Sequence, residues 1–68
     1  MSELYAVRVV YLDHQWVTVE EIVIVEATRQ EEAGIKAVAC VARRVGVAMG
    51  SAYAQPYAQQ IWRLVTDG

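Results

Sequence analysis

The feature that most constrains the fold is a pair of valine-rich runs separated by a short polar turn. Residues 4–12 read LYAVRVVYL, in which the odd-numbered side chains form one apolar row, and this alternation predicts a β-strand. Residues 16–26 read WVTVEEIVIVE and predict a second strand. The connecting residues 13–15, DHQ, are polar and have the length of a hairpin turn. We therefore expect the chain to begin with an antiparallel β-hairpin.

The second run changes phase in its middle. Val17 and Val19 share one parity, whereas Ile22 and Ile24 have the opposite parity. A β-bulge at the intervening pair of glutamates would return all four apolar side chains to the core side of the sheet. We therefore expect a bulge at that pair, which would also keep the two charges in solvent.

The segment that follows the hairpin has the signals of a capped helix over residues 29–45. Thr28 with Glu31 three residues later forms a capping-box pattern. Acidic residues lie at the predicted start and Arg43 and Arg44 at the end, as the helix dipole favours. Gly46 is a natural stop. The apolar residues at helical spacing, which predict the buried stripe, are Ile35, Val38, Ala42 and Val45.

The rest of the chain is expected to contain a long loop and a last strand. Two glycines and Pro56 follow the helix, and the tail 59–67, QQIWRLVTD, alternates as a strand does. The alternative is a short second helix that starts at Pro56. The predicted fold is a single α+β domain over residues 1–68: a ββαβ chain whose three-stranded antiparallel sheet carries one helix packed on one face, with ββαα as the alternative.

Composition limits how such a domain is stabilised. The chain has 68 residues, one cysteine and no Cys/His cluster, so neither a disulfide within the chain nor a structural zinc site is expected. Hydrophobic residues make up 56% of the chain, but twelve are valines and ten are alanines, which each bury little area. Dense packing or association with a partner must therefore supply the remaining stability. A homodimer fits this composition.

Membrane insertion and secretion are not expected. No apolar run approaches the roughly 18 residues of a membrane-spanning helix. The first residues, MSELYAV, carry an acid where a secretory signal would carry basic charge. The expected location is the cytoplasm, where a lone reduced thiol is ordinary.

The sequence contains no pattern that predicts an enzyme. His14 beside Asp13 is interpreted as a solvated turn residue, because nothing in the sequence places a nucleophile with it. Cys40 lies near the predicted apolar stripe and is interpreted as a small buried hydrophobic residue. The spacing of Gly46 and Gly50 matches no phosphate-binding loop. We therefore expect no catalytic residue, no cofactor and no metal.

The acidic residues are concentrated in one part of the chain. Five of the eight acids fall within thirteen residues, which leads us to expect that they gather at one end of the domain. They could form a solvated rim or an acidic patch that occupies the basic, nucleic-acid-binding groove of another protein. The residues of this candidate patch are Glu20, Glu21, Glu26, Glu31 and Glu32.

A second candidate surface is the uncharged segment 51–60, SAYAQPYAQQ. Tyrosine offers contact area at low entropic cost, and glutamine offers adaptable hydrogen bonds. The alternative is that the tyrosines fold back over a thin core. The candidate contact residues are Tyr53, Gln55 and Tyr57.

Direct binding of nucleic acid is the alternative to binding of a protein. Arginines can contact phosphates, and aromatic side chains on a sheet can stack on bases. The net charge of −2 does not favour this function. The residues that would carry it are Arg8, Arg43, Arg44 and Arg63.

The hairpin followed by residues 26–33, EATRQEEA, resembles the layout of small phage-encoded accessory proteins, including anti-CRISPR proteins of ββαβ order. This resemblance implies a non-enzymatic inhibitor that binds a CRISPR effector subunit and blocks access of target nucleic acid, and it assigns no residue a role. The expected function is therefore a small protein-binding module. A nucleic-acid-binding accessory protein and a self-assembling structural domain are the alternatives.

Overall fold

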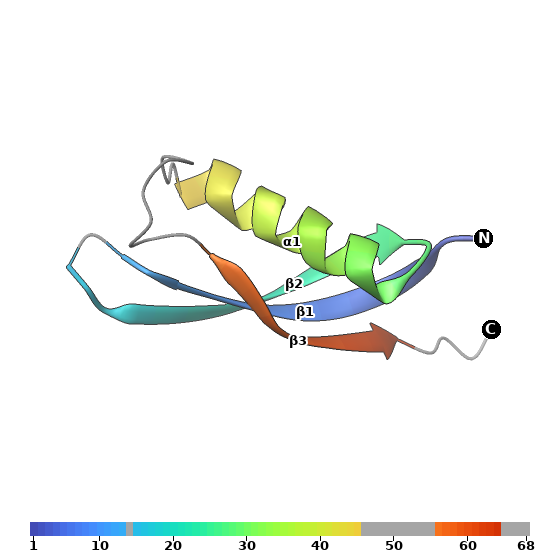
Figure 1. Ribbon diagram of the computed structural model, residues 1–68, viewed down its shortest axis with the longest axis horizontal. Helices are drawn as coiled ribbons and strands as arrows, with labels where there is room; N and C mark the ends of the chain where they lie inside the picture. The colour runs from blue at the N-terminus through green and yellow to red at the C-terminus, as the bar shows by residue number, and fades with distance from the viewer. Residues whose placement is uncertain (14, 46–55, 65–68) are drawn as a thin grey trace.

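The structure is a computed structural model that describes residues 1–13, 15–45 and 56–64. Its elements follow in the order β1 (Glu3–Leu12), β2 (Thr18–Ala27), α1 (Gln30–Val45) and β3 (Tyr57–Leu64). Figure 1 shows α1 lying along one face of the strands. The ββαβ prediction is confirmed, and the tail forms a strand rather than a second helix.

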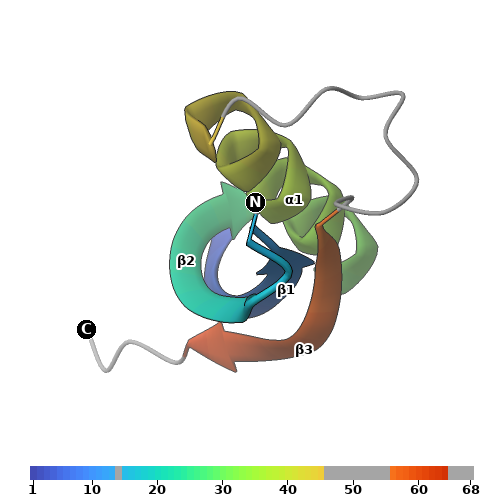
Figure 2. The ribbon, with the colours of Figure 1, turned by 90° about the vertical axis from the view of Figure 1, so that its left-hand side faces the viewer.

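The three strands form one antiparallel sheet in the order β2-β1-β3. The hairpin places β1 beside β2, and the chain then crosses by way of α1 to add β3 at the other edge of β1. Viewed along the long axis, β2 and β3 lie on either side of β1 beneath the helix (Figure 2). The first strand is therefore the central one, and most of its residues are buried on both of its faces.

The register corrects the predicted position of the bulge. Pairing between β1 and β2 runs without interruption from Glu3 opposite Ala27 to Leu12 opposite Thr18. The bulge expected at the two glutamates of β2 is therefore wrong. An irregularity lies instead in the pairing with β3, where Arg8 is opposite Gln60 and the next residue of β1 is opposite Ala58. One residue of β3, Gln59, is thus extra.

The hairpin turn is held by Asp13. Its carboxylate accepts hydrogen bonds from the backbone N–H groups of Gln15 at 2.8 Å and Val17 at 3.0 Å. Its backbone oxygen accepts a third from Trp16, which has a φ of 62°. A three-residue hairpin loop of this kind uses a left-handed residue at its end, usually glycine. His14 lies outside the described residues.

The core lies between the sheet and the helix and is built from alanines and valines together with two tyrosines of β1. Alternate residues of β1 point toward α1, which contributes alanines, a glycine and a valine. A Cβ at Gly34 would lie 3.0 Å from the Cδ1 atom of Ile61 and 3.6 Å from the Cβ atom of Ala58. The absence of a side chain at this position lets the helix approach β3 closely. The core residues are Tyr5, Val7, Val9, Tyr11, Ala27, Ala33, Ala37 and Val41.

The buried face of α1 differs from the predicted stripe. Of the four predicted residues, Ala42 is buried and Val38 packs against the core, but Ile35 is 72% exposed and Val45 is also exposed. The other buried residues of α1 are the small ones just described. Cys40 is exposed as well, so its assignment as a buried residue is wrong. Hydrophobicity favoured the larger side chains, but close contact with the sheet selects the small ones.

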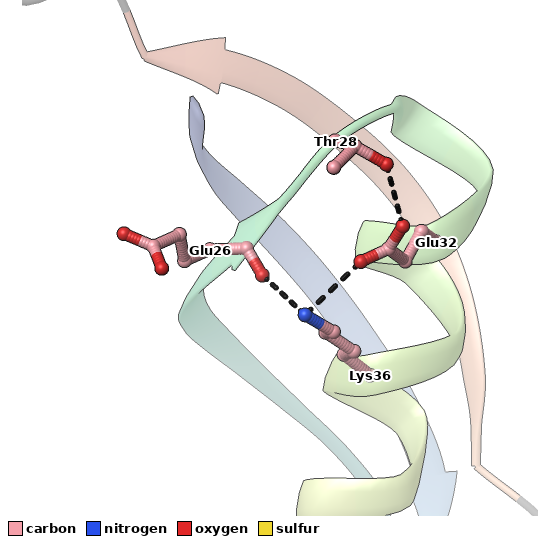
Figure 3. A network of polar contacts seen from close by, with 4 residues as sticks. All are labelled: Glu26, Thr28, Glu32 and Lys36. Carbon is pink, nitrogen blue, oxygen red and sulfur yellow. Dashed lines mark hydrogen bonds and ion pairs between the residues drawn. The ribbon is translucent and has the colours of Figure 1, made fainter. Parts of the chain in front are cut away.

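The helix begins in a network that uses a different glutamate from the one predicted. Glu32, not Glu31, accepts a 2.7 Å hydrogen bond from the Thr28 hydroxyl. Its other oxygen lies 3.0 Å from the Lys36 ammonium, which also donates a 2.8 Å bond to the backbone oxygen of Glu26 (Figure 3). The hydroxyl of Thr28 and the ammonium of Lys36 lower the pKa of the Glu32 carboxyl. This network joins the end of β2 to the first turns of α1.

Candidate interaction surface

The sheet face that points away from α1 carries large apolar side chains. Among the described residues, no helix or strand covers this face (Figure 1). Ile22 is 53% exposed and Ile24 is 55% exposed, both on β2, and Leu4 and Leu64 are also exposed. We call this surface the open face. Its apolar residues are Leu4, Ala6, Val10, Leu12, Ile22, Ile24, Tyr57, Trp62 and Leu64.

The strand register brings these side chains together. Residues directly opposite each other in an antiparallel pair lie on the same side of a sheet. Ala6 is opposite Ile24 on one side and Trp62 on the other, which places the three in one row across the strands. Leu4 is opposite Leu64 in the neighbouring row. The open face therefore carries apolar side chains from all three strands, with polar and charged residues between them. Its central-strand members Ala6 and Val10 are buried between their neighbours, so the exposed apolar area comes mainly from the two edge strands.

The chain places many of its largest aliphatic side chains on this face and not in the core. All three leucines and two of the four isoleucines belong to the open face. The largest fully buried side chains under the helix are the valines Val7, Val9 and Val41. An exposed apolar surface of this kind on a small domain is typical of an interaction site.

One cation lies near the middle of the open face. The guanidinium carbon of Arg8 is 5.5 Å from the centroid of the Trp62 ring, within the range of a cation–π interaction. Arg8 is opposite Ile22 in β2 and Gln60 in β3. Its aliphatic stem therefore lies between Ile22 and Gln60, while its charge lies against the indole of Trp62.

The five predicted acidic residues do not form one patch. Glu20 is on the open face, opposite Val10. Glu21 is on the helix side, where it accepts a 2.8 Å hydrogen bond from the Tyr11 hydroxyl and pairs with Arg44 at the end of α1. Its bond to the phenol raises the pKa of Tyr11.

Of the remaining three acids, Glu26 lies on the open face near the end of β2, and Glu31 and Glu32 lie in the first turn of α1. Glu21 and Glu26 are five positions apart, which corresponds to about 17 Å along an extended strand. The expectation that the acids gather at one end of the domain is therefore wrong.

Of the three tyrosine and glutamine candidates, only Tyr57 lies within the described residues. Tyr57 is 53% exposed, but it is the first residue of β3 and lies opposite Val10 on the open face. The strand therefore begins two residues before the predicted start at residue 59, and Tyr57 belongs to it. Tyr53 and Gln55 lie outside the described residues.

The four arginines proposed for nucleic-acid binding occupy three separate places. Arg8 lies on the open face, whereas Arg63 lies on the helix side with its guanidinium 3.8 Å from the carboxylate of Glu3. Arg43 and Arg44 lie in the last turn of α1. They line an open groove together with Lys36, Ala39 and Cys40. These cations therefore do not form one track for a phosphate backbone.

Metal-binding clusters and membrane-spanning helices are both absent from the part of the chain that the structure describes. Within residues 1–13, 15–45 and 56–64, no group of three His, Cys, Asp or Glu side chains lies close enough to hold a metal ion. In the same ranges, no helix is both long and apolar enough to cross a membrane.

Sequence reasoning did not identify the open face. The signal was present in the opposite parity of Ile22 and Ile24 and in the nearly continuous apolar character of residues 4–12. A central strand that is apolar on both sides predicts a layer on each face of the sheet. The assumed bulge in β2 removed this signal by turning both isoleucines inward.

Comparisons with protein-family models, with curated proteins and with solved structures gave no match. The functional argument therefore depends on the geometry of the chain itself.

Proposed function

We propose that the protein is a small non-enzymatic protein-binding module whose contact surface is the open face. The observation that carries this proposal is the exposure of Ile22 and Ile24 beside Trp62 on a sheet that has a helix on only one side. Sheets bury each apolar face against another layer of structure. The missing layer is the proposed binding partner.

The composition of the open face suits an apolar protein surface. Interfaces are enriched in aromatic residues and arginine at their centres, and truncation of such residues often costs the most affinity. Trp62, Tyr57 and Arg8 supply these residue types, and isoleucines and leucines surround them. The separation of the arginines favours a protein over nucleic acid as the partner.

The test compares two isoleucines that are both exposed but lie on different faces. Ile24→Lys places a charge on the open face, whereas Ile35→Lys places the same charge on the exposed side of α1. Tagged wild type and both variants would be used to capture proteins, and binding of each captured protein would be measured again with purified components. We expect a partner that binds the wild type and Ile35→Lys and does not bind Ile24→Lys. Equal binding by all three proteins would contradict the proposal.

Inhibition of a CRISPR effector subunit is the narrower form of this proposal. It is tested with the same two variants in an assay of target DNA binding by the effector. The expected result is that wild type and Ile35→Lys inhibit DNA binding and that Ile24→Lys does not. No inhibition by the wild type would remove the narrower form and leave the binding module in place.

A further inference from the structure

We infer that the partner on the open face is a second copy of this chain, packed sheet to sheet about a two-fold axis with the two helices outermost. This inference rests on the proposed function and names the partner. The dimer would have four layers, helix, sheet, sheet and helix, so that each sheet is covered on both faces.

The size of the open face fits such a dimer. Three strands about 4.8 Å apart and about 30 Å long give a projected area on the order of 400 Å² for each copy. Two corrugated faces of this size bury on the order of 1,000 Å² in total, which reaches the lower bound for a specific interface. Homodimer interfaces are also more apolar than other interfaces, as the open face is.

The charges on the open face are complementary to those on a second copy. The face carries one cation, Arg8, and two carboxylates, Glu20 and Glu26, on the adjacent strand. In a two-fold interface every contact occurs twice, because residue i meets residue j and j meets i. Each Arg8 can therefore pair with one carboxylate of the opposite copy, and the second carboxylate of each copy lies nearer the end of the strand, where it can stay in solvent.

The core of a single copy is thin, and this favours dimerisation through the open face. The chain has one cysteine, and valines are its largest fully buried side chains. A domain of this size gains stability from oligomerisation when it lacks disulfides or metals. Pairing through the free edge of β2 would instead leave Ile22 and Ile24 in solvent.

Sedimentation equilibrium of the full chain, from micromolar to millimolar concentration, tests the inference. For the wild type and Ile35→Lys we expect a mass that rises with concentration from 7.6 kDa to twice that value. Ile24→Lys is expected to stay at 7.6 kDa. A second variant, Ile24→Thr, keeps a β-branched residue that suits a strand and is expected to raise the dimer Kd at least about tenfold.

A wild type that stays monomeric throughout would overturn the inference, and so would an Ile24→Thr variant that dimerises as tightly as the wild type. Circular dichroism would confirm that each variant is folded. The same measurements distinguish failure of this inference from failure of the proposed function. A monomeric chain that still binds another protein through Ile24 disproves the second copy and retains the binding module, whereas a monomeric chain with no such binding disproves both.

Discussion

Arg8 and Trp62 lie together on the sheet face opposite the helix, with the guanidinium carbon 5.5 Å from the centroid of the indole ring. Arg8 belongs to the central strand and Trp62 to the edge strand β3. The arginine places its charge over the ring without breaking the apolar row formed by Ala6 and its neighbours. The pair therefore gives the open face a cationic centre within apolar surroundings.

Charge reversal at this centre should weaken self-association. Arg8→Glu would place a third carboxylate on a face that already carries Glu20 and Glu26. We expect the dimer Kd to rise at least about tenfold, equivalent to about 1.4 kcal/mol. The control Arg8→Lys retains a cation near Trp62 and should change the Kd far less. Equal values of Kd for both variants, measured by sedimentation, would show that Arg8 is not part of the interface.

The bond between Tyr11 and Glu21 should contribute to stability and make it depend on alkaline pH. Tyr11→Phe should lower the free energy of unfolding at neutral pH by about 1 kcal/mol. The hydrogen bond to Glu21 and burial raise the pKa of Tyr11 above its ordinary value of about 10. A raised pKa stabilises the fold below the unfolded-state value, and this contribution is lost as the pH rises through the folded-state value.

The measurement is urea denaturation as a function of pH from neutral to strongly alkaline conditions. The pKa of Tyr5 is also raised, chiefly by burial, so Tyr5→Phe serves as the comparison. Part of the stability that the wild type loses at alkaline pH comes from Tyr11 and part from Tyr5. Each Tyr→Phe variant should therefore lose less stability at alkaline pH than the wild type does. An unchanged pH profile for Tyr11→Phe would show that its hydrogen bond does not hold Glu21 on the helix side.

The network at the start of the helix should protect against acid. Bonds from Thr28 and Lys36 lower the pKa of Glu32, so its contribution is present above the unfolded-state pKa and is lost as the pH falls through the lower folded-state value. Thr28→Ala should therefore shift the acid-denaturation midpoint to higher pH. Glu31→Gln, at the neighbouring exposed position, should shift it less. Equal shifts in circular dichroism titrations would contradict the assignment of the cap to Glu32.

The close approach of α1 to β3 should make Gly34 intolerant of a branched side chain. A Cβ at this position would lie 3.0 Å from the Cδ1 atom of Ile61 and 3.6 Å from the Cβ atom of Ala58, so a branched side chain must displace Ile61. Gly34→Val should lower the free energy of unfolding by about 2 kcal/mol. The control Ala39→Val, on the exposed side of the same helix, should cost less than about 1 kcal/mol. Similar losses in urea denaturation would show that the helix does not pack closely at Gly34.

The helix and the hairpin were predictable from sequence because their signals are local. Alternation in residues 4–12 and the cap before residue 30 depend on neighbours within a few positions. The orientation of the helix was not predictable in this way. Its buried side follows from close contact with β3, which favours Gly34 and alanines over the more hydrophobic Ile35.

The inward position of Glu21 depends on partners that lie far away in the chain. The Tyr11 hydroxyl comes from the facing strand, and Arg44 comes from the end of the helix. Without those partners a glutamate on the core side of a sheet is unfavourable, and a bulge is the natural prediction. The error carried over to the candidate site, because the same shift of register decides whether Ile22 and Ile24 face the helix or solvent.

The central claim, that a second copy covers the open face, is tested most directly at Trp62. In a Trp16→Phe background Trp62 is the single tryptophan of the chain, so its quenching by acrylamide reports how accessible the open face is. We predict that the quenching constant falls as the protein concentration rises from micromolar to millimolar, and that it stays constant when Ile24→Lys is added to this background. A quenching constant that does not change with concentration in the Trp16→Phe protein would contradict the claim.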